Sequence, residues 1–237
     1  MVCCSVKYKG INLIFLTMFP QRLINGYNDF LNGRMEKERH LYKQLGEQGQ
    51  VPEIMVISCG DSRVAPEIIF GAGPGELFVI RNIANLVPSV ESGHSNADTQ
   101  HGTSAAVEYA TNALRVRHIV VLGHANCGGV RAYANKIAPL SKSDFIGKWM
   151  SQIKGVVDKI GPRPEAEEDE ASWIRQIELG VVEHSLNNLM TFPTVKERVE
   201  SGDLFLHGAY FGIASGMLYY RNPKSGEFLP CLSFDEA

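Results

Sequence analysis

The sequence predicts an α/β fold: a single domain with a mostly parallel central β-sheet flanked by helices, an antiparallel edge strand from the C-terminus, and an N-terminal helical arm. Three short apolar runs rich in β-branched residues, 53–58, 76–82 and 118–124, indicate strands. A helical pattern of about four turns, 103–116, separates the last two, and strands that alternate with helices are typical of a parallel sheet. The 237 residues are 44% hydrophobic and show no internal repeat, which favours one substantial core.

The N-terminal part is predicted to lie outside that core. Apolar residues recur at helical spacing in two segments between Pro20 and Gly49, separated at Asn32 and Gly33, and predict a helical arm over residues 20–48. Residues 1–19 are expected to be an extension that could be disordered, and Met18 is an alternative start. The apolar run INLIFLTMF within this extension is too short to span a bilayer, and no cleavage site of the signal-peptide type follows it.

The α/β core is expected to span residues 53–237, so that arm and core make one domain over 20–237. After the third strand, ANCGGVRAYANK predicts a helix start, and a long helical region follows. The acidic stretch 161–172 interrupts it, most simply as a solvated loop and helix start. Residues 203–212 predict a further buried strand, and 216–230 a hairpin with its turn at 222–226.

Charge and cysteine content limit the kinds of partner. The net charge is −3 and both signs are mixed along the chain, so neither nucleic acid nor a membrane is an expected partner, and the substrate should be small. An odd, widely spread set of cysteines argues against a disulfide framework and for reduced thiols in the cytoplasm. The set comprises Cys3, Cys4, Cys59, Cys127 and Cys231.

Three residues with metal-binding chemistry are expected to converge at one edge of the sheet. Cys59 and His124 each follow a predicted parallel strand, and such strands have their carboxyl ends on the same edge. Cys127 comes three residues after His124, so the turn can present both side chains to one ion. A Cys₂His set suits zinc and leaves a fourth position free. Taken singly, each residue is better explained by packing, and the two cysteines could form a disulfide; together, the three favour a metal.

Asp61 and Arg63 accompany this set. Alternation along an extended segment places Cys59, Asp61 and Arg63 toward the same side, so the guanidinium can bind the carboxylate bidentately beside the metal. An ordinary salt bridge at a strand end would be the alternative for the pair alone.

Taken together, CGDSR and GHANCGG make the sequence resemble the β-class carbonic anhydrases. The resemblance extends to PGELFVIRNIAN, AAVEYA and LFLHGAYFGIASGMLYY, and so covers nearly all of residues 20–230. It implies a zinc lyase that interconverts carbon dioxide and bicarbonate through zinc-bound hydroxide, with one zinc per chain on Cys59, His124 and Cys127. In this scheme Asp61, held by Arg63, accepts a hydrogen bond from the hydroxide and orients its attacking lone pair.

The resemblance also implies a substrate pocket and a subclass. Its pocket positions match Gln50, Phe78, Ile83, Tyr109 and Gly128, some of them contributed by partner subunits in a dimer or a dimer of dimers. Phe78 and Ile83 could equally be core residues.

Closed-site members of the family carry a tryptophan three residues before the first cysteine ligand. Val56 stands there in this chain, which indicates the plant-like, open-site subclass, with Asp61 bonded to Arg63 and not to zinc. Arg81 matches an arginine found in both subclasses and does not discriminate between them.

Two rival functions remain open on the sequence. One is a carbon disulfide or carbonyl sulfide hydrolase of the same fold, and the other is a non-catalytic protein that binds zinc or bicarbonate. The retained Asp61 and Arg63 argue against the second. No metal role is expected for five histidines outside the motif: His94, His101, His118, His184 and His207.

Overall fold

The computed structural model describes residues 19–90, 102–136 and 142–231. The chain divides into two compact units, one ending at Gly49 and the other beginning at Gln50. Within the described ranges, no helix combines the length and apolarity needed to cross a membrane. The extension 1–19, apart from Phe19, lies outside the described residues, as do Cys3, Cys4, His94 and His101.

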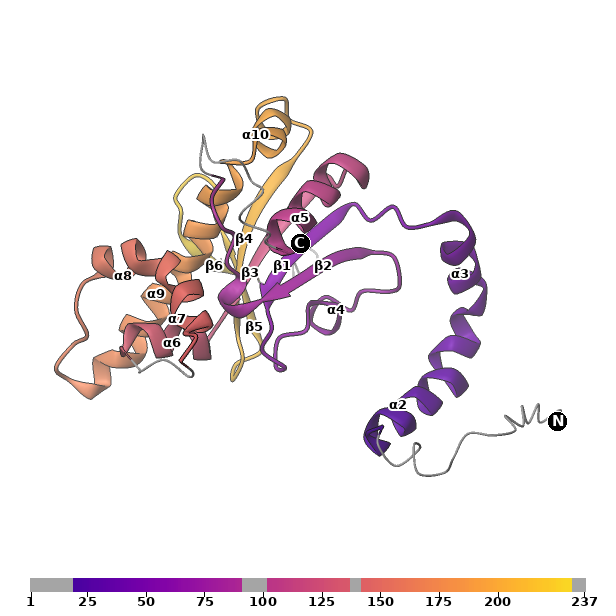
Figure 1. Ribbon diagram of the computed structural model, residues 1–237, viewed down its shortest axis with the longest axis horizontal. Helices are drawn as coiled ribbons and strands as arrows, with labels where there is room; N and C mark the ends of the chain where they lie inside the picture. Colours follow the sequence, from indigo (N-terminus) through magenta and orange to yellow (C-terminus); the bar gives the residue numbers. More distant parts are fainter. Residues whose placement is uncertain (1–18, 91–101, 137–141, 232–237) are drawn as a thin grey trace, which may run out of the picture. The chain divides into compact units, whose positions relative to one another are not determined.

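The first unit contains the two predicted helices, α2 (Gln21–Asn32) and α3 (Arg34–Gln48) (Figure 1). They meet at Gly33, where a Cβ would lie 2.9 Å from the Asp29 carbonyl oxygen, so glycine permits the close approach. The Phe30 and Tyr42 rings pack edge to face at 5.7 Å and join the two helices. Neither helix contains a buried residue. The arm is therefore helical as predicted, but the described residues of the unit give its apolar side chains little cover.

The second unit confirms the predicted α/β fold, with strand and helix bounds close to those expected. Its strands are β1 (Ile54–Cys59), β2 (Leu77–Asn82), β3 (His118–His124), β4 (Phe205–Gly212), β5 (Met217–Arg221) and β6 (Phe228–Pro230). Its helices are α4 (Pro66–Ile69), α5 (Gly102–Glu108), α6 (Gly128–Ala134), α7 (Phe145–Met150), α8 (Lys154–Ile160), α9 (Glu167–Leu189) and α10 (Pro193–Glu200). Short turns of 3-10 helix cover Ile83–Asn85 and Ser151–Ile153.

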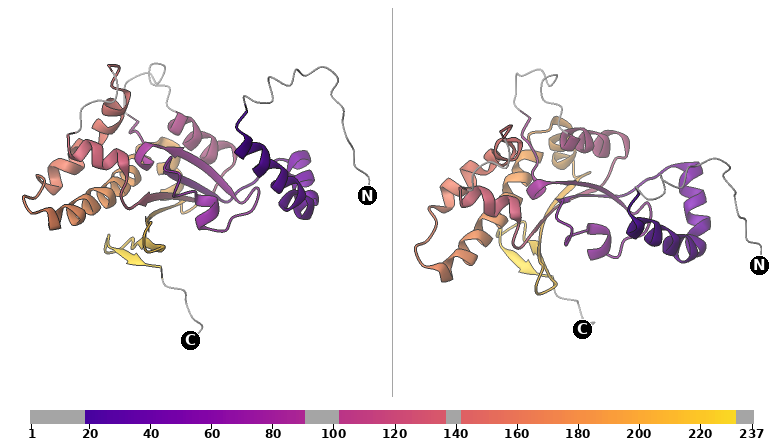
Figure 2. Two further views of the ribbon diagram at one scale, coloured as in Figure 1. Left: turned by 90° about the horizontal axis from the view of Figure 1, so that it is seen from below. Right: turned by 60° about the horizontal axis from the view of Figure 1, so that its bottom comes forward.

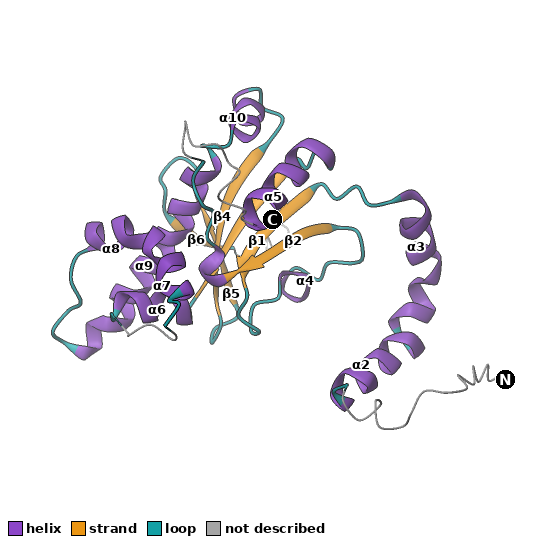
Figure 3. Cartoon of the chain, in the orientation of Figure 1, coloured by secondary structure: helices purple, strands orange, loops and turns teal. Residues whose placement is uncertain are grey.

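The six strands form one sheet in the order β2-β1-β3-β4-β5-β6. Figure 3 shows the strands in orange and the helices in purple. The first four in this order are parallel, and β5 and β6 are antiparallel additions. The C-terminal hairpin therefore forms the sheet edge beyond β4, as Figure 2 shows from two further directions. In register, Cys59 lies opposite Asn82, and His124 lies opposite Phe211. β1 and β3 are parallel neighbours with Ser58 opposite Leu122, so their carboxyl ends lie side by side at one edge of the sheet.

One face of the sheet packs against α5, α9 and α10. The core on this face joins residues of β1 and β3 to side chains of those helices: Met55, Ile57, Ile119, Val121, Val107, Val182, Leu189 and Val195. Burial of these side chains supplies the main driving force for folding. On the other face, Val56, Leu122 and Ala209 form a smaller cluster, packed against the half-buried Ile69 of α4 and other partly buried side chains of the sheet.

One predicted helical segment differs in detail from the structure. The pattern over 103–116 begins as α5 but continues as a π-helical turn, Tyr109–Ala113, where hydrogen bonds widen by one residue.

The acidic stretch is a loop and a helix start, as predicted. It supplies the first turn of α9, at Glu167 to Glu170. Negative side chains stabilise that end of a helix because they oppose its dipole.

Candidate metal centre

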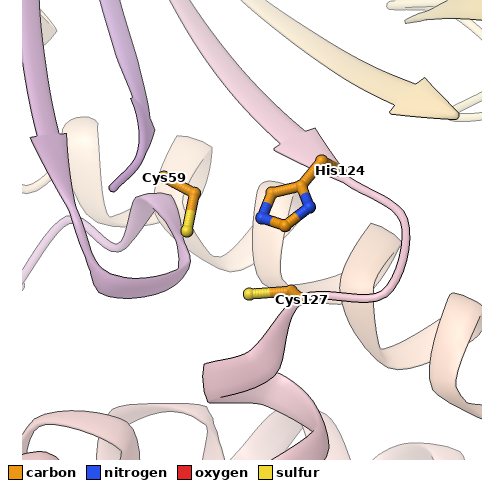
Figure 4. Close-up of side chains that lie close together, drawn as sticks. All are labelled: Cys59, His124 and Cys127. Carbon is orange, nitrogen blue, oxygen red and sulfur yellow. The ribbon is translucent and has the colours of Figure 1, made fainter. Parts of the chain in front are cut away.

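Cys59, His124 and Cys127 come together as the sequence predicts. Their ligand atoms all lie within 4.8 Å of one another, and their side chains point toward a common centre (Figure 4). Cys59 ends β1, His124 ends β3, and Cys127 directly precedes α6. All three are at most 4% exposed. A thiolate pair and an imidazole at this spacing are a donor set for zinc.

His124 is oriented for metal binding through its Nε2 atom. Its Nδ1 lies 2.9 Å from the Ala125 carbonyl oxygen, to which it donates when protonated. Its Nε2 is buried and, within the described part of the chain, has no hydrogen-bond partner. An unpaired buried nitrogen is costly, and a metal ion at the centre of the three side chains would satisfy it. The residues present therefore fit zinc.

The two thiols influence each other strongly. Cys127, helped by His124, stabilises the Cys59 thiolate and lowers the pKa of Cys59 to about 4, although burial opposes this shift. The same interaction, together with burial, raises the pKa of Cys127. Burial lowers the pKa of His124, but the neighbouring Cys59 thiolate outweighs it and raises the pKa overall. Without a metal the centre thus favours one thiolate, and a bound dication allows the second thiolate to form.

The turn between His124 and Cys127 has an unusual backbone. Asn126 adopts a left-handed conformation with φ of 56°, which asparagine tolerates better than most residues. The carbonyl oxygen of Asn126 accepts a hydrogen bond from Arg63 Nη2 at 3.2 Å. One arginine therefore connects the loop after β1 to the loop after β3.

Asp61 and Arg63 form a bidentate pair beside the ligands. Arg63 Nε donates to Asp61 Oδ1 at 2.9 Å, and Nη2 donates to Oδ2 at 2.6 Å. The backbone N–H of Arg63 also donates to Oδ1, at 3.0 Å. The guanidinium holds the pKa of Asp61 well below its usual range, so the carboxylate stays charged. The Asp61 side chain is 18% exposed, and that of Arg63 is 49% exposed.

Two residues that sequence reasoning did not connect with the centre hold its loops. Arg81, on β2, donates from Nε to the Cys59 carbonyl oxygen at 2.9 Å and from Nη2 to that of Asp61 at 2.6 Å. Glu178, on α9, accepts the Cys127 backbone N–H at 2.8 Å. Glu178 falls among the apolar residues that α9 buries. A charged residue within an apolar helical stripe is the sequence feature that could have indicated its role.

The predicted pocket residues divide into two groups. Gly128 begins α6 directly after Cys127. Ile83 lies close to the turn between His124 and α6, here called the metal loop, since a Cβ on Gly129 would approach Ile83 Cγ2 to 2.6 Å. Phe78 and Tyr109 contact each other, with ring centroids 5.8 Å apart. Phe78 pairs with Met55, four residues before Cys59, and thus roughly 13 Å along the strand from the ligand. Gln50 is exposed and precedes β1.

Comparison with known proteins supports a single family. Residues 54–218 match the carbonic anhydrase family, which is most of the chain and includes all three ligands. The chain belongs to the β-carbonic anhydrase family. The chloroplastic β-carbonic anhydrase 5 of Arabidopsis thaliana is 38% identical over 171 residues, 72% of this chain and 54% of that protein. A carbonic anhydrase of Synechocystis is 35% identical over 199 residues, 83% of this chain and 69% of that protein.

Solved β-carbonic anhydrases share the fold. The structure of the β-carbonic anhydrase CcaA superimposes with a TM-score of 0.77 at 30% identity, covering 90% of this chain and 92% of that one. One of the tetrameric β-carbonic anhydrases from Sordaria macrospora gives 0.71 at 30% identity, covering 84% and 95%. The chain spans about half the length of the Arabidopsis relative, 54%, and nearly all of these structures. Family membership and the ligand cluster together identify zinc as the cofactor.

Proposed function

We propose that this protein catalyses the reversible hydration of carbon dioxide to bicarbonate and a proton. The observation that carries this proposal is the buried Cys59, His124 and Cys127 cluster, with the Asp61 and Arg63 pair beside it, in a chain of this family. Zinc held by Cys59, His124 and Cys127 would act as a Lewis acid and lower the pKa of bound water toward neutrality. The described side chains of this chain then orient that water and shape the space for the gas.

Asp61 is the hydrogen-bond acceptor that orients the water. Its Oδ1 accepts two N–H groups of Arg63, whereas Oδ2 accepts only one. A carboxylate oxygen has two lone pairs, so Oδ2 keeps one acceptor site for the O–H of the attacking water. Because Arg63 fixes both oxygens, the water's own lone pair is directed toward the carbon of carbon dioxide. Asp61 stays with Arg63 in this open arrangement, in keeping with Val56 three residues before Cys59.

The pocket for carbon dioxide is proposed to form between subunits. Ile83 and Gly128 lie beside the metal loop of their own chain, whereas Phe78 and Tyr109 pair farther from Cys59 along the sheet. We therefore assign Phe78, Tyr109 and Gln50 to the site of a partner copy, in a dimer or a dimer of dimers. Apolar side chains around carbon dioxide keep the site dry, and the Gln50 amide can donate to bicarbonate. The tetrameric Sordaria enzymes support a homo-oligomer.

A cytoplasmic location is proposed from the cysteines. Both ligand cysteines are free and buried, and the third described cysteine, Cys231, is also free. Thiolates at zinc-binding distance need reducing conditions to remain ligands. Localisation of a tagged chain in cells by microscopy tests this, and an exported chain would contradict it.

Stopped-flow hydration of carbon dioxide, combined with elemental analysis, tests the proposed activity. We expect one zinc per chain and hydration that Cys59→Ser abolishes, because two remaining ligands hold zinc poorly. Cys231→Ser is the matched control, since Cys231 is exposed and lies outside the cluster, and it should keep both zinc and activity. Zinc without hydration would overturn the activity. Normal zinc content in Cys59→Ser would overturn the ligand assignment.

A further inference from the structure

Helix α9 buries one carboxylate among apolar side chains. Glu178 is 4% exposed and is flanked on the buried stripe by Ile174, Ile177 and Val181. Burying a carboxylate costs free energy unless hydrogen bonds compensate. Burial raises the pKa of Glu178, and hydrogen bonds from Tyr210 and Cys127 oppose that shift. The energetic cost of this placement calls for specific partners.

Each oxygen of Glu178 has one such partner. Oε1 accepts the Cys127 backbone N–H at 2.8 Å, and Oε2 accepts the Tyr210 hydroxyl at 2.7 Å. Tyr210 is itself fixed, being 3% exposed, with the Arg175 guanidinium 5.6 Å from its ring centroid. Arg175 also lies 5.1 Å from the Tyr219 ring on β5. The carboxylate is therefore held from both sides and cannot turn away from Cys127.

The N–H that Glu178 accepts belongs to the residue that carries the ligand sulfur. Cys127 is the N-cap of α6, and the N–H groups at the start of a helix have no partner within it. Glu178 supplies that partner and thereby fixes the peptide from which the Cys127 side chain projects. Arg81 in turn holds the carbonyl oxygen of the other cysteine ligand, Cys59. Both cysteine ligands are thus anchored through their backbones by a charged side chain.

We propose that Glu178 is a positioning residue of the metal centre, which sets the direction of the Cys127 thiolate and so slows the release of zinc. This inference rests on the zinc site of the proposed function and adds a residue from α9 to it. Outer residues that orient metal ligands typically change metal affinity by about 10- to 100-fold when they are replaced.

Zinc release to a coloured chelator, in the absence of carbon dioxide, tests the proposal. Glu178→Ala leaves the Cys127 N–H without its acceptor, and we expect release about 10- to 100-fold faster. Glu178→Gln can still accept that N–H through its amide oxygen and donate to the Tyr210 oxygen, so release should stay within about threefold of wild type. Glu183→Gln is the matched control on α9, because Glu183 pairs with Arg221 away from the centre.

Two further readouts separate positioning from a merely structural role. With Co²⁺ in place of zinc, the thiolate absorption bands should shift in Glu178→Ala and match wild type in Glu178→Gln. The rise in unfolding temperature that zinc produces should shrink in Glu178→Ala, whereas a purely structural loss lowers the metal-free and zinc forms equally.

The outcomes are distinct. Wild-type zinc release and Co²⁺ bands in Glu178→Ala would overturn the proposal while leaving the proposed function intact. A wild-type chain that holds no zinc would overturn both. If Glu178→Ala does not fold, Tyr210→Phe decides, since it removes only the hydroxyl that fixes Oε2: faster release supports the proposal, and unchanged release with unchanged bands overturns it.

Discussion

At the scale of single residues, the lone pairs on Asp61 determine how many hydrogen bonds it can accept beyond those from Arg63. Arg63 occupies three of its four acceptor positions, all at 3.0 Å or less, and leaves one on Oδ2. An ion pair whose side chains are 18% and 49% exposed contributes little to stability by itself. Its value is therefore geometric, because it fixes one acceptor beside a metal-binding cluster.

Replacing Asp61 by asparagine should lower kcat for hydration by about 10²-fold or more, because the amide presents N–H groups where the water needs an acceptor. Zinc content should stay at that of wild type, since Asp61 is outside the ligand cluster. Stopped-flow kinetics and elemental analysis measure the two quantities. Asp158→Asn removes a carboxylate from an exposed pair with Lys154 on α8 and should change neither. A wild-type kcat in Asp61→Asn would refute the assigned role.

The residues that the sequence predicted correctly are those whose local pattern determines their place. Cys59 and His124 end parallel strands, so sheet topology alone brings them to one edge. The role of Glu178 was not predicted, because its partner Cys127 is 51 positions away and on another element. Arg81 could be matched to the family, but only the folded loop after β1 shows which carbonyl oxygens it holds.

At the scale of elements, the position of α9 against the sheet depends on a glycine next to a ligand. Gly123 directly precedes His124 on β3, and a Cβ there would lie 2.6 Å from Val182 Cγ2 on α9. Gly208 on β4 meets the same valine, at 3.1 Å from Cγ1. Real Cβ atoms essentially never approach as closely as at Gly123, and a contact like that at Gly208 is unusually tight. The helix therefore lies this close to the strands because both residues lack side chains.

Gly123→Ala should therefore destabilise the protein by about 1–3 kcal/mol, through overpacking between β3 and α9. Combining it with Val182→Ala should cost less than the sum of the two single changes, because the second removes the clashing methyl group. Urea unfolding at matched zinc content and protein concentration measures the cycle. Gly155→Ala on α8 is the control, since its Cβ would meet nothing within 4 Å. Strict additivity would contradict the packing argument.

Element type and approximate bounds followed from the sequence, whereas local distortions did not. β3 occurs at the predicted residues because an apolar β-branched run has one plausible reading between two helical patterns. The π-helical turn after α5 has no such signature, since it inserts a hydrogen-bond shift without changing the apolar pattern.

At the scale of the whole molecule, large apolar side chains are exposed among the described residues of both units. In the first unit, the exposed large side chains include Phe19, Leu23, Tyr27, Leu31 and Leu41. In the second unit, Phe205 on β4 and Tyr220 on β5 are exposed on the sheet face that carries Ala209. In the first unit, Leu23, Tyr27 and Leu31 recur every four residues and so share one helix face, and an exposed apolar face marks a contact surface. The proposed homo-oligomer would bury such surfaces and bring Phe78 and Tyr109 to a second metal centre.

The chain is expected to have a mass of two or four times 26.2 kDa by light scattering, independent of concentration over the assay range. Leu23→Ser with Tyr27→Ser should weaken association at least about 100-fold, because burial of one such side chain contributes about 1.5–3 kcal/mol and a two-fold interface counts each twice. Lys43→Ser on α3 is the control, since that side chain is 71% exposed and polar. Hydration by the doubly substituted chain should fall as it dissociates, because each centre would lose the pocket residues assigned to its partner. A persistent monomer with full activity would refute both the assembly and the shared pocket.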